Sequence, residues 1–172
     1  MRHVIDPGTP EIHQIPLPDA GDLGEYIPFY FGGHSPMLYL IMKGYKGVQQ
    51  RPQEDIVFLI STYQTVEQAG LEFVFTDRNA KLAFANFYNE EQYLDQIQWD
   101  VVKSRVWKND ESSLNRQDYK QAEFLVRNYM PVNCLTVLVT KNEAKKRYFE
   151  ELMLNLSLDI PVYQDKTSKL YY

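Results

Sequence analysis

Cysteine, long apolar runs and excess positive charge are all scarce in this sequence, and each shortage excludes a class of protein. The single cysteine, Cys134, cannot form a disulfide within the chain, so a reducing compartment is indicated. No apolar run approaches the ~20 residues that a membrane-spanning helix needs, and the N-terminus lacks the apolar core of a signal peptide. We therefore expect a cytoplasmic protein that does not enter a membrane.

The charge balance is also poor in positive residues. The net charge is −5, which argues against wholesale electrostatic binding of nucleic acid. Taken alone, any local group of basic residues more often forms a solvated surface than a binding site. Three such groups are present: Lys43, Lys46 and Arg51; Lys103, Arg105 and Lys108; and Arg116, Lys120 and Arg127. Histidine is scarce too, and neither His3 nor His13 has a Cys or acidic partner at metal-ligand spacing, so no metal site is expected.

Aromatic residues are abundant, at 14% of the chain with thirteen tyrosines. Their flat faces with polar ends suit a protein core, and they also suit stacking on bases or nucleotide rings. A chain of 172 residues is most simply one domain. Residues 1–24 hold four of the nine prolines and no sustained period, so they are expected to form an extended arm or loop before a domain at residues 25–172.

The apolar patterns predict an α+β fold with several short strands. Strands are predicted at residues 26–31, 56–61, 72–76, 120–129, 134–139 and 160–164. Helices are predicted at residues 37–45 and 77–89, and from a capping box of Thr140 and Glu143 to residue 156. Residues 93–107 are expected to be a helix or an irregular segment, and residues 108–119 an exposed loop.

Two stretches suggest sites. Gly32 and Gly33 permit a tight turn before Ser35, a helix N-cap with proline after it, so backbone N–H groups there could face an anion. An ordinary strand-to-helix connection is the commoner explanation. In the strand at residues 120–129, Gln121 and Glu123 share one face. Placing a carboxylate on an apolar strand costs free energy unless a positive or hydrogen-bonding group compensates it. A functional site is one arrangement that does so, but ion-paired or edge-exposed glutamates are commoner.

These stretches, in this order, resemble the DarT family of DNA ADP-ribosyltransferase toxins. The resemblance runs from about Gly24 to the end of the sequence and is carried by YIPFYF, SPMLY, IVFLIS, FVFTD, LDQIQW, QAEFLV and the terminal PV…YY. It implies an ADP-ribosyltransferase-like mixed β core with flanking helices that binds NAD⁺ in a cleft. It also implies transfer of ADP-ribose to a base in single-stranded DNA, thymine or in some members guanine, and an antitoxin partner of the DarG type whose macrodomain removes the modification.

The resemblance also assigns residues. Glu123 matches the catalytic glutamate, and Gln121 takes a position that often addresses the acceptor. The segment at residues 108–120 matches a substrate-recognising loop. Ser35, Met37 and Tyr39 match the segment that lines the NAD⁺ pocket. From their positions in the loop and strand, further residues are candidates for stacking on a base (Tyr119) or contacting DNA phosphates (Arg116, Lys120 and Arg127).

Two departures from the family are visible. Many members carry arginine before Ser-Pro-Met, where this sequence has His34, which could serve as a hydrogen-bond donor to the cofactor or as a solvent-facing residue. Members normally also begin with a further segment that contains a histidine-bearing strand and a helix, and this sequence is expected to start after it.

Three alternatives to the DNA-modifying enzyme follow. The chain could be a truncated, inactive relative that only binds DNA or antitoxin. It could be an ADP-ribosyltransferase that acts on protein or RNA. Glycoside hydrolysis ranks last, because it usually needs two opposed carboxylates and no second acid pairs convincingly with Glu123.

Overall fold

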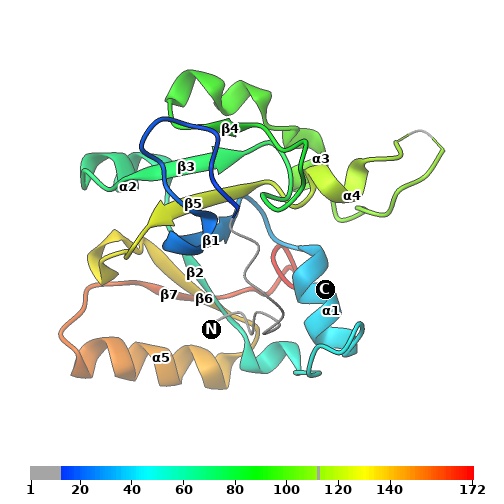
Figure 1. Ribbon diagram of the computed structural model, residues 1–172. Coiled ribbons are helices and arrows are strands. Elements are labelled where there is room, and N and C mark those ends of the chain that lie inside the picture. Colours follow the sequence, from blue (N-terminus) through cyan, green and yellow to red (C-terminus); the bar gives the residue numbers. More distant parts are fainter. Residues whose placement is uncertain (1–12, 112) are drawn as a thin grey trace.

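Two β-sheets form the centre of the protein, with helices around them (Figure 1). The computed structural model describes residues 13–111 and 113–172. The first sheet is antiparallel in the order β1-β5-β3-β4, and its strands are β1 (Tyr26–Tyr30), β5 (Glu123–Arg127), β3 (Phe73–Thr76) and β4 (Phe87–Tyr88). The second sheet has the order β2-β6-β7, with β6 and β7 parallel, and its strands are β2 (Val57–Ile60), β6 (Val137–Thr140) and β7 (Val162–Gln164).

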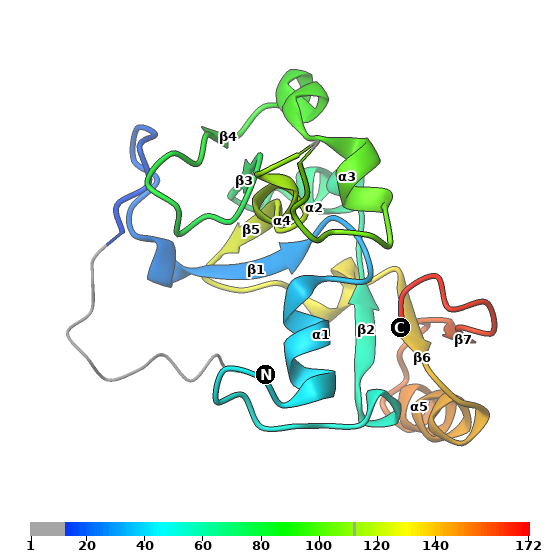
Figure 2. The ribbon, with the colours of Figure 1, turned by 90° about the vertical axis from the view of Figure 1, so that its right-hand side faces the viewer.

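Five α-helices of the described residues surround the sheets. They are α1 (Pro36–Lys43), α2 (Tyr63–Gln68), α3 (Trp99–Lys103), α4 (Arg116–Tyr119) and α5 (Glu143–Asn155). Helix α5 runs along the second sheet, where Met153 packs with Leu138 and Val162. Helix α1 lies beside β2 and below the end of β1 (Figure 2). Short 3-10 helices occupy Leu23–Glu25, Gln53–Asp55, Glu91–Gln96 and Val132–Cys134. The predicted α+β class, with mixed sheets and flanking helices, is confirmed.

Strand β5 is buried on both faces and carries the alternation that the sequence predicts. Phe124 and Val126 enter one core with Ala122, which precedes the strand. Leu125 enters another, on the opposite face of the sheet. Strand β5 therefore has apolar packing above and below it, and Glu123 at its start is held on a rigid element.

The described part of the expected arm or loop, residues 13–24, packs against the first sheet. Ile15 and Ala20 are buried beside Leu125 and Val74. The Asp22 side chain accepts a hydrogen bond from the backbone N–H of Gly24 at 2.7 Å. His3 lies outside the described residues. Burial of the apolar Ile15 and Ala20 side chains therefore stabilises the packing of this segment on the sheet.

The start of α1 is as the sequence predicts. Ser35 Oγ accepts a hydrogen bond from the backbone N–H of Leu38 at 3.1 Å, and Pro36 is the first helical residue. The helix ends at Gly44, whose φ of 66° is the left-handed conformation that glycine adopts without steric cost.

The helix predicted at residues 77–89 is wrong. These residues form a loop followed by β4, because the buried Asp77 carboxylate closes the loop on itself. Asp77 Oδ1 accepts from the backbone N–H of Asn86 at 3.1 Å, and Oδ2 accepts from the side-chain amide of Asn86 at 2.9 Å. Hydrogen bonds of a short acidic side chain to nearby groups compete with helix formation, and here they prevail over the apolar spacing.

The capping box predicted at Thr140 is also wrong. Thr140 is the fully buried last residue of β6, and its hydroxyl donates to the backbone oxygen of Asn142 at 3.1 Å. Asn142 is the actual N-cap of α5, accepting from the backbone N–H of Lys145 at 2.9 Å. Helix α2 was not predicted from the sequence. Residues 93–107 contain the end of a 3-10 helix and α3, the predicted loop ends in α4, and the predicted strands differ from the observed ones at their ends.

Candidate active site

Glu123 is partly buried at the start of β5, where it lies directly opposite Tyr30 of β1. Burial raises the pKa of the Glu123 carboxyl above its ordinary value, although the backbone N–H of Ala80, 2.9 Å from Oε2, and the charge of Lys81 oppose the shift. Burial and the nearby Glu123 charge also raise the pKa of the Tyr30 hydroxyl. The site therefore holds a carboxyl that binds its proton more tightly than a solvated glutamate does.

The loop closed by Asp77 brings Gln121 and Glu123 together. Asn79 Nδ2 donates to Gln121 Oε1 at 3.3 Å, while the next residue, Ala80, donates to Glu123. Gln121 lies just before β5 and not within it, and its amide also donates to the backbone oxygen of Gln117 at 3.0 Å. The two predicted site residues thus share one supporting loop.

Arg78, on the same loop, was missed by sequence reasoning. Its guanidinium forms an ion pair with Asp77 at 2.9 Å, donates to Tyr119 Oη at 3.1 Å and lies 4.5 Å from the centre of the Tyr119 ring. Tyr119, predicted to stack on a base, therefore has a cation against its ring. The only sequence signal was the position of Arg78 directly after FVFTD.

The three predicted phosphate-binding residues have different surroundings. Lys120 is buried, and its Nζ donates to the backbone oxygens of Val102 at 2.5 Å and Ser104 at 2.7 Å. Burial lowers the pKa of Lys120 to about 8. Arg116 forms an ion pair with Asp110. Lys120 thus joins α4 to the end of α3, and it does not extend into solvent toward a phosphate.

Arg127 is at the opposite end of β5 from Glu123. It forms ion pairs with Glu25 at 2.7 Å and Glu72 at 2.9 Å. The hydrogen bonds that the guanidinium donates to Glu25 and then to Glu72 raise its pKa. Arg127 therefore ties β1 and β3 to β5, away from the carboxyl.

His34 is buried, with 3% of its surface exposed, in the turn between β1 and α1. Its Nε2 lies 2.7 Å from the backbone oxygen of Tyr171; because a carbonyl can only accept, Nε2 carries the proton. Burial lowers the pKa of the imidazole, so the neutral form is favoured. A Cβ on Gly33 would lie 2.7 Å from Leu170 Cα, so the close approach of these segments requires glycine. His34 is thus enclosed by the C-terminal segment and does not occupy the solvent-facing position considered for it.

A cavity of about 470 Å³ lies between β1, β2 and α1. Of the predicted cofactor-binding residues, Ser35 and Met37 line it, whereas Tyr39 packs against Trp107 and Tyr172. Tyr30, the residue opposite Glu123 in the sheet, also lines the cavity, and on β5 the lining residues are Phe124 and Val126.

Neither a metal cluster nor a membrane helix is found in residues 13–111 and 113–172. No three His, Cys, Asp or Glu side chains in this part are grouped to hold an ion. No helix there is both long and apolar enough to cross a bilayer.

Comparison with known proteins gives one consistent family. Residues 5–172 match the family model described as "ssDNA thymidine ADP-ribosyltransferase, DarT". A DNA ADP-ribosyl transferase of Escherichia coli O127:H6 is 32% identical over 165 residues, covering 92% of this chain and 76% of the relative. The chain spans about half the length of two curated Thermus relatives that it also matches, 54% of one and 50% of the other.

Solved structures agree in fold. Thermus sp. 2.9 DarT in complex with ADP-ribosylated ssDNA has a TM-score of 0.82 and 30% identity, covering 92% of this chain and 74% of that chain. The same Thermus protein in complex with NAD⁺ has a TM-score of 0.80 and 32% identity, covering 92% of this chain and 78% of that chain.

Proposed function

Because the chain belongs to the DarT family of ADP-ribosyltransferases, we propose that it transfers ADP-ribose from NAD⁺ to a base in single-stranded DNA. The observation that carries this proposal is the Glu123 carboxyl, partly buried, held by the Ala80 N–H and opposite Tyr30, which lines a cavity together with Ser35 and Met37. The Thermus relative bound to NAD⁺ and to ADP-ribosylated ssDNA supports the two substrates. The family description supports thymine as the base.

In the proposed reaction, the bond between the nicotinamide nitrogen and the ribose carbon breaks, and nicotinamide leaves with the electron pair. The positive charge that develops on the sugar is stabilised by the Glu123 carboxylate, which accepts a hydrogen bond from the ribose 2′-hydroxyl. A base nitrogen then bonds to the sugar carbon and loses its proton. Glu123 accepts that proton, a step for which a general base typically contributes about 10²–10⁴-fold.

The raised pKa of Glu123 suits this second role. A carboxyl that binds protons more tightly than a solvated one is a stronger base at the moment the DNA base loses its proton. Gln121, held by Asn79, is proposed to address the acceptor base, and Tyr119, with Arg78 against its ring, to stack on it.

The test is Glu123→Ala, assayed for transfer of labelled ADP-ribose to a single-stranded oligonucleotide. Labelling is expected to fall at least about 100-fold, as the general-base contribution alone would predict. Glu151→Ala, at an exposed position of α5, is the matched control and should label DNA at the parental rate. Undiminished labelling by Glu123→Ala would remove the residue from the mechanism.

One observation favours a second candidate, a chain that binds DNA or a protein partner without transferring ADP-ribose. The buried His34, bonded to Tyr171, supplies no exposed cation where many relatives have arginine. Calorimetry with NAD⁺ separates the two proposals, because only the enzyme should give binding heat.

The resemblance to the family extends the proposal to cellular context. We propose that the chain acts as a toxin in the cytoplasm, where NAD⁺ and single-stranded DNA occur together, and that a macrodomain antitoxin of the DarG type is its partner. Growth arrest on expression, relieved by such a macrodomain, is the expected result.

A further inference from the structure

Positive charge is segregated in this acidic chain. Residues 26–53 contain Lys43, Lys46 and Arg51 and no acidic residue, and residues 101–108 contain Lys103, Arg105 and Lys108 and no acidic residue. Two short segments thus hold six of the 18 basic residues and none of the 23 acidic ones. The remainder of the chain is correspondingly more acidic.

These six cations also differ from the other basic residues in their partners. None forms an ion pair with an acidic side chain anywhere in the described ranges. Six basic side chains elsewhere are paired with carboxylates: Arg78, Arg116, Arg127, Lys145, Lys146 and Arg147. The nearest acid after Lys108, Asp110, is bound by Arg116. The positive charge on the two segments is therefore not neutralised by an ion pair with any acidic side chain of residues 13–111 and 113–172.

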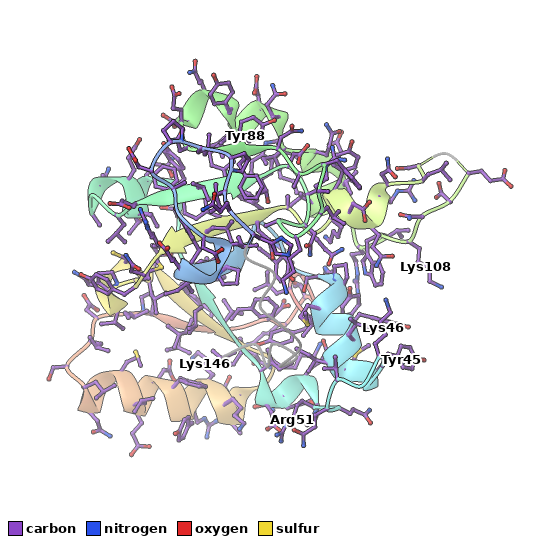
Figure 3. All side chains as sticks on the ribbon, in the orientation of Figure 1. Tyr45, Lys46, Arg51, Tyr88, Lys108 and Lys146 are labelled. Carbon is purple, nitrogen blue, oxygen red and sulfur yellow. The ribbon has the colours of Figure 1, made fainter. Side chains whose placement is uncertain are left out.

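Aromatic side chains join the two segments into one surface. The Tyr39 ring on α1 packs edge-on against Trp107 at 5.5 Å and against Tyr45 at 6.1 Å. Lys43 Nζ lies 6.0 Å from the centre of the Tyr39 ring. Tyr45 is 53% exposed, so much of its ring is open to a ligand. In Figure 3, Tyr45, Lys46 and Lys108 lie on the same side of the molecule, with Arg51 toward its lower end.

We propose that this basic aromatic surface, formed by Tyr39, Tyr45 and Trp107 with Lys43, Lys46, Arg51, Arg105 and Lys108, binds the single-stranded DNA that flanks the modified base. Unpaired cations beside aromatic rings are the combination that single strands require, since the cations meet phosphates and the rings stack on bases. A base-paired strand would offer phosphates alone and leave the Tyr45 ring without a partner.

The surface is connected to the candidate active site. Trp107 lies in the segment between α3 and α4, and α4 is followed by Gln121 and Glu123. Trp107 Nε1 donates to Tyr172 Oη at 2.5 Å, and Tyr172 in turn binds the turn at His34, beside the cavity. A strand lying on this surface would therefore lie next to the turn at His34 that begins α1.

The inference rests on the proposed function, and the experiment separates the two. Binding of a fluorescent single-stranded oligonucleotide is measured by anisotropy at several salt concentrations, and transfer of ADP-ribose to it is measured in parallel. Lys46→Glu with Lys108→Glu is expected to weaken binding at least about tenfold. It should also lower the magnitude of the slope of log affinity against log salt by about 1.4, since each of the two lost phosphate contacts on a single strand contributes about 0.7.

The matched control is Lys146→Glu with Arg147→Glu, the same charge change on α5, which should bind the oligonucleotide within twofold of the parent. Tyr45→Ala is expected to weaken binding about fivefold or more through lost stacking, while Tyr45→Phe retains it. Because Tyr45 is exposed, Tyr45→Ala and Tyr45→Phe are both expected to fold. They therefore test DNA binding by this surface even where the charge variant fails to fold.

Each other outcome overturns the inference. Equal binding by the parent and by both surface variants, with transfer intact, overturns the inference alone and leaves the proposed function standing. Tighter binding of RNA of the same sequence assigns the surface to a different partner. A parent chain that neither binds nor labels single-stranded DNA overturns the proposed function and the inference together.

Discussion

Tyr172 Oη donates a hydrogen bond to the backbone oxygen of His34 at 2.6 Å, and so fixes a turn 138 residues away in the sequence. The same hydroxyl lies 3.1 Å from the backbone oxygen of Ser35. Burial raises the pKa of Tyr172 to about 12, so the hydroxyl keeps the proton that it donates. His34 has a φ of 51°, a conformation that a non-glycine residue adopts only when its surroundings hold it there.

Tyr172→Phe is therefore expected to loosen the start of α1. Removal of the hydroxyl leaves the carbonyl of His34 and the indole N–H of Trp107 without this partner, at a cost of about 1–3 kcal/mol for a buried unsatisfied group. At the size of this chain, each kcal/mol corresponds to about 2–4 °C in melting temperature. Thermal melting measures the change, and NAD⁺ binding should weaken with it because Ser35 lines the cavity. Tyr163→Phe, at an exposed position of β7, is the control; equal melting of both variants would contradict the structural role of Tyr172.

Glu123→Gln is expected to stabilise the protein at pH 7. Burial raises the pKa of Glu123 above 4.5, so the folded chain holds this proton more tightly than the unfolded chain. Stability therefore falls as the pH rises from about 4.5 through the folded-state pKa. Glutamine stays neutral and can still accept from the Ala80 N–H, so its advantage should be present at pH 7 and absent near pH 4. Melting curves at both pH values measure it, and an equal difference at the two would refute the burial argument.

Lys120→Met tests a contribution to stability whose dependence on pH is opposite to that of Glu123. Burial lowers the pKa of Lys120 to about 8 from 10.5, so between these values the unfolded chain binds more protons and stability rises with pH. The variant should be less stable at every pH, by about 1–3 kcal/mol, because two backbone oxygens lose their donor. Its deficit should grow as the pH rises from about 8 to about 10. A constant deficit in denaturant melts would show that Lys120 does not titrate in this range.

Local patterns predicted most of the fold and only part of the site. The helix start at Ser35 and the alternation around Phe124 depend on neighbouring residues, and both are confirmed. The loop after β3 could not be predicted, because the Asp77 carboxylate closes it by contacts that apolar spacing does not reveal. His34 and Lys120 were assigned to ligands from their sequence positions, whereas their partners come from distant segments.

Asp77→Ala should disconnect the loop that supports Glu123. Although burial raises the pKa of the Asp77 carboxyl, hydrogen bonds from Arg78 and then from Asn86 outweigh it and lower the pKa overall. The stabilisation is therefore present at neutral pH and is lost as the pH falls through the folded-state value. Without the carboxylate, Asn79 and Ala80 lose their fixed positions against Gln121 and Glu123, and ADP-ribose transfer should fall with stability.

Asp77→Asn is the informative partner variant, since the amide keeps the shape and one acceptor oxygen but loses the ion pair with Arg78. It should retain more transfer activity than Asp77→Ala, because the loop can still close on Asn86. Its stability should also vary less with pH below neutrality than that of the parent chain, because residue 77 no longer titrates. Oligonucleotide labelling and melting between pH 3 and pH 7 measure both effects. Full transfer by Asp77→Ala would mean that Glu123 is positioned by β5 alone.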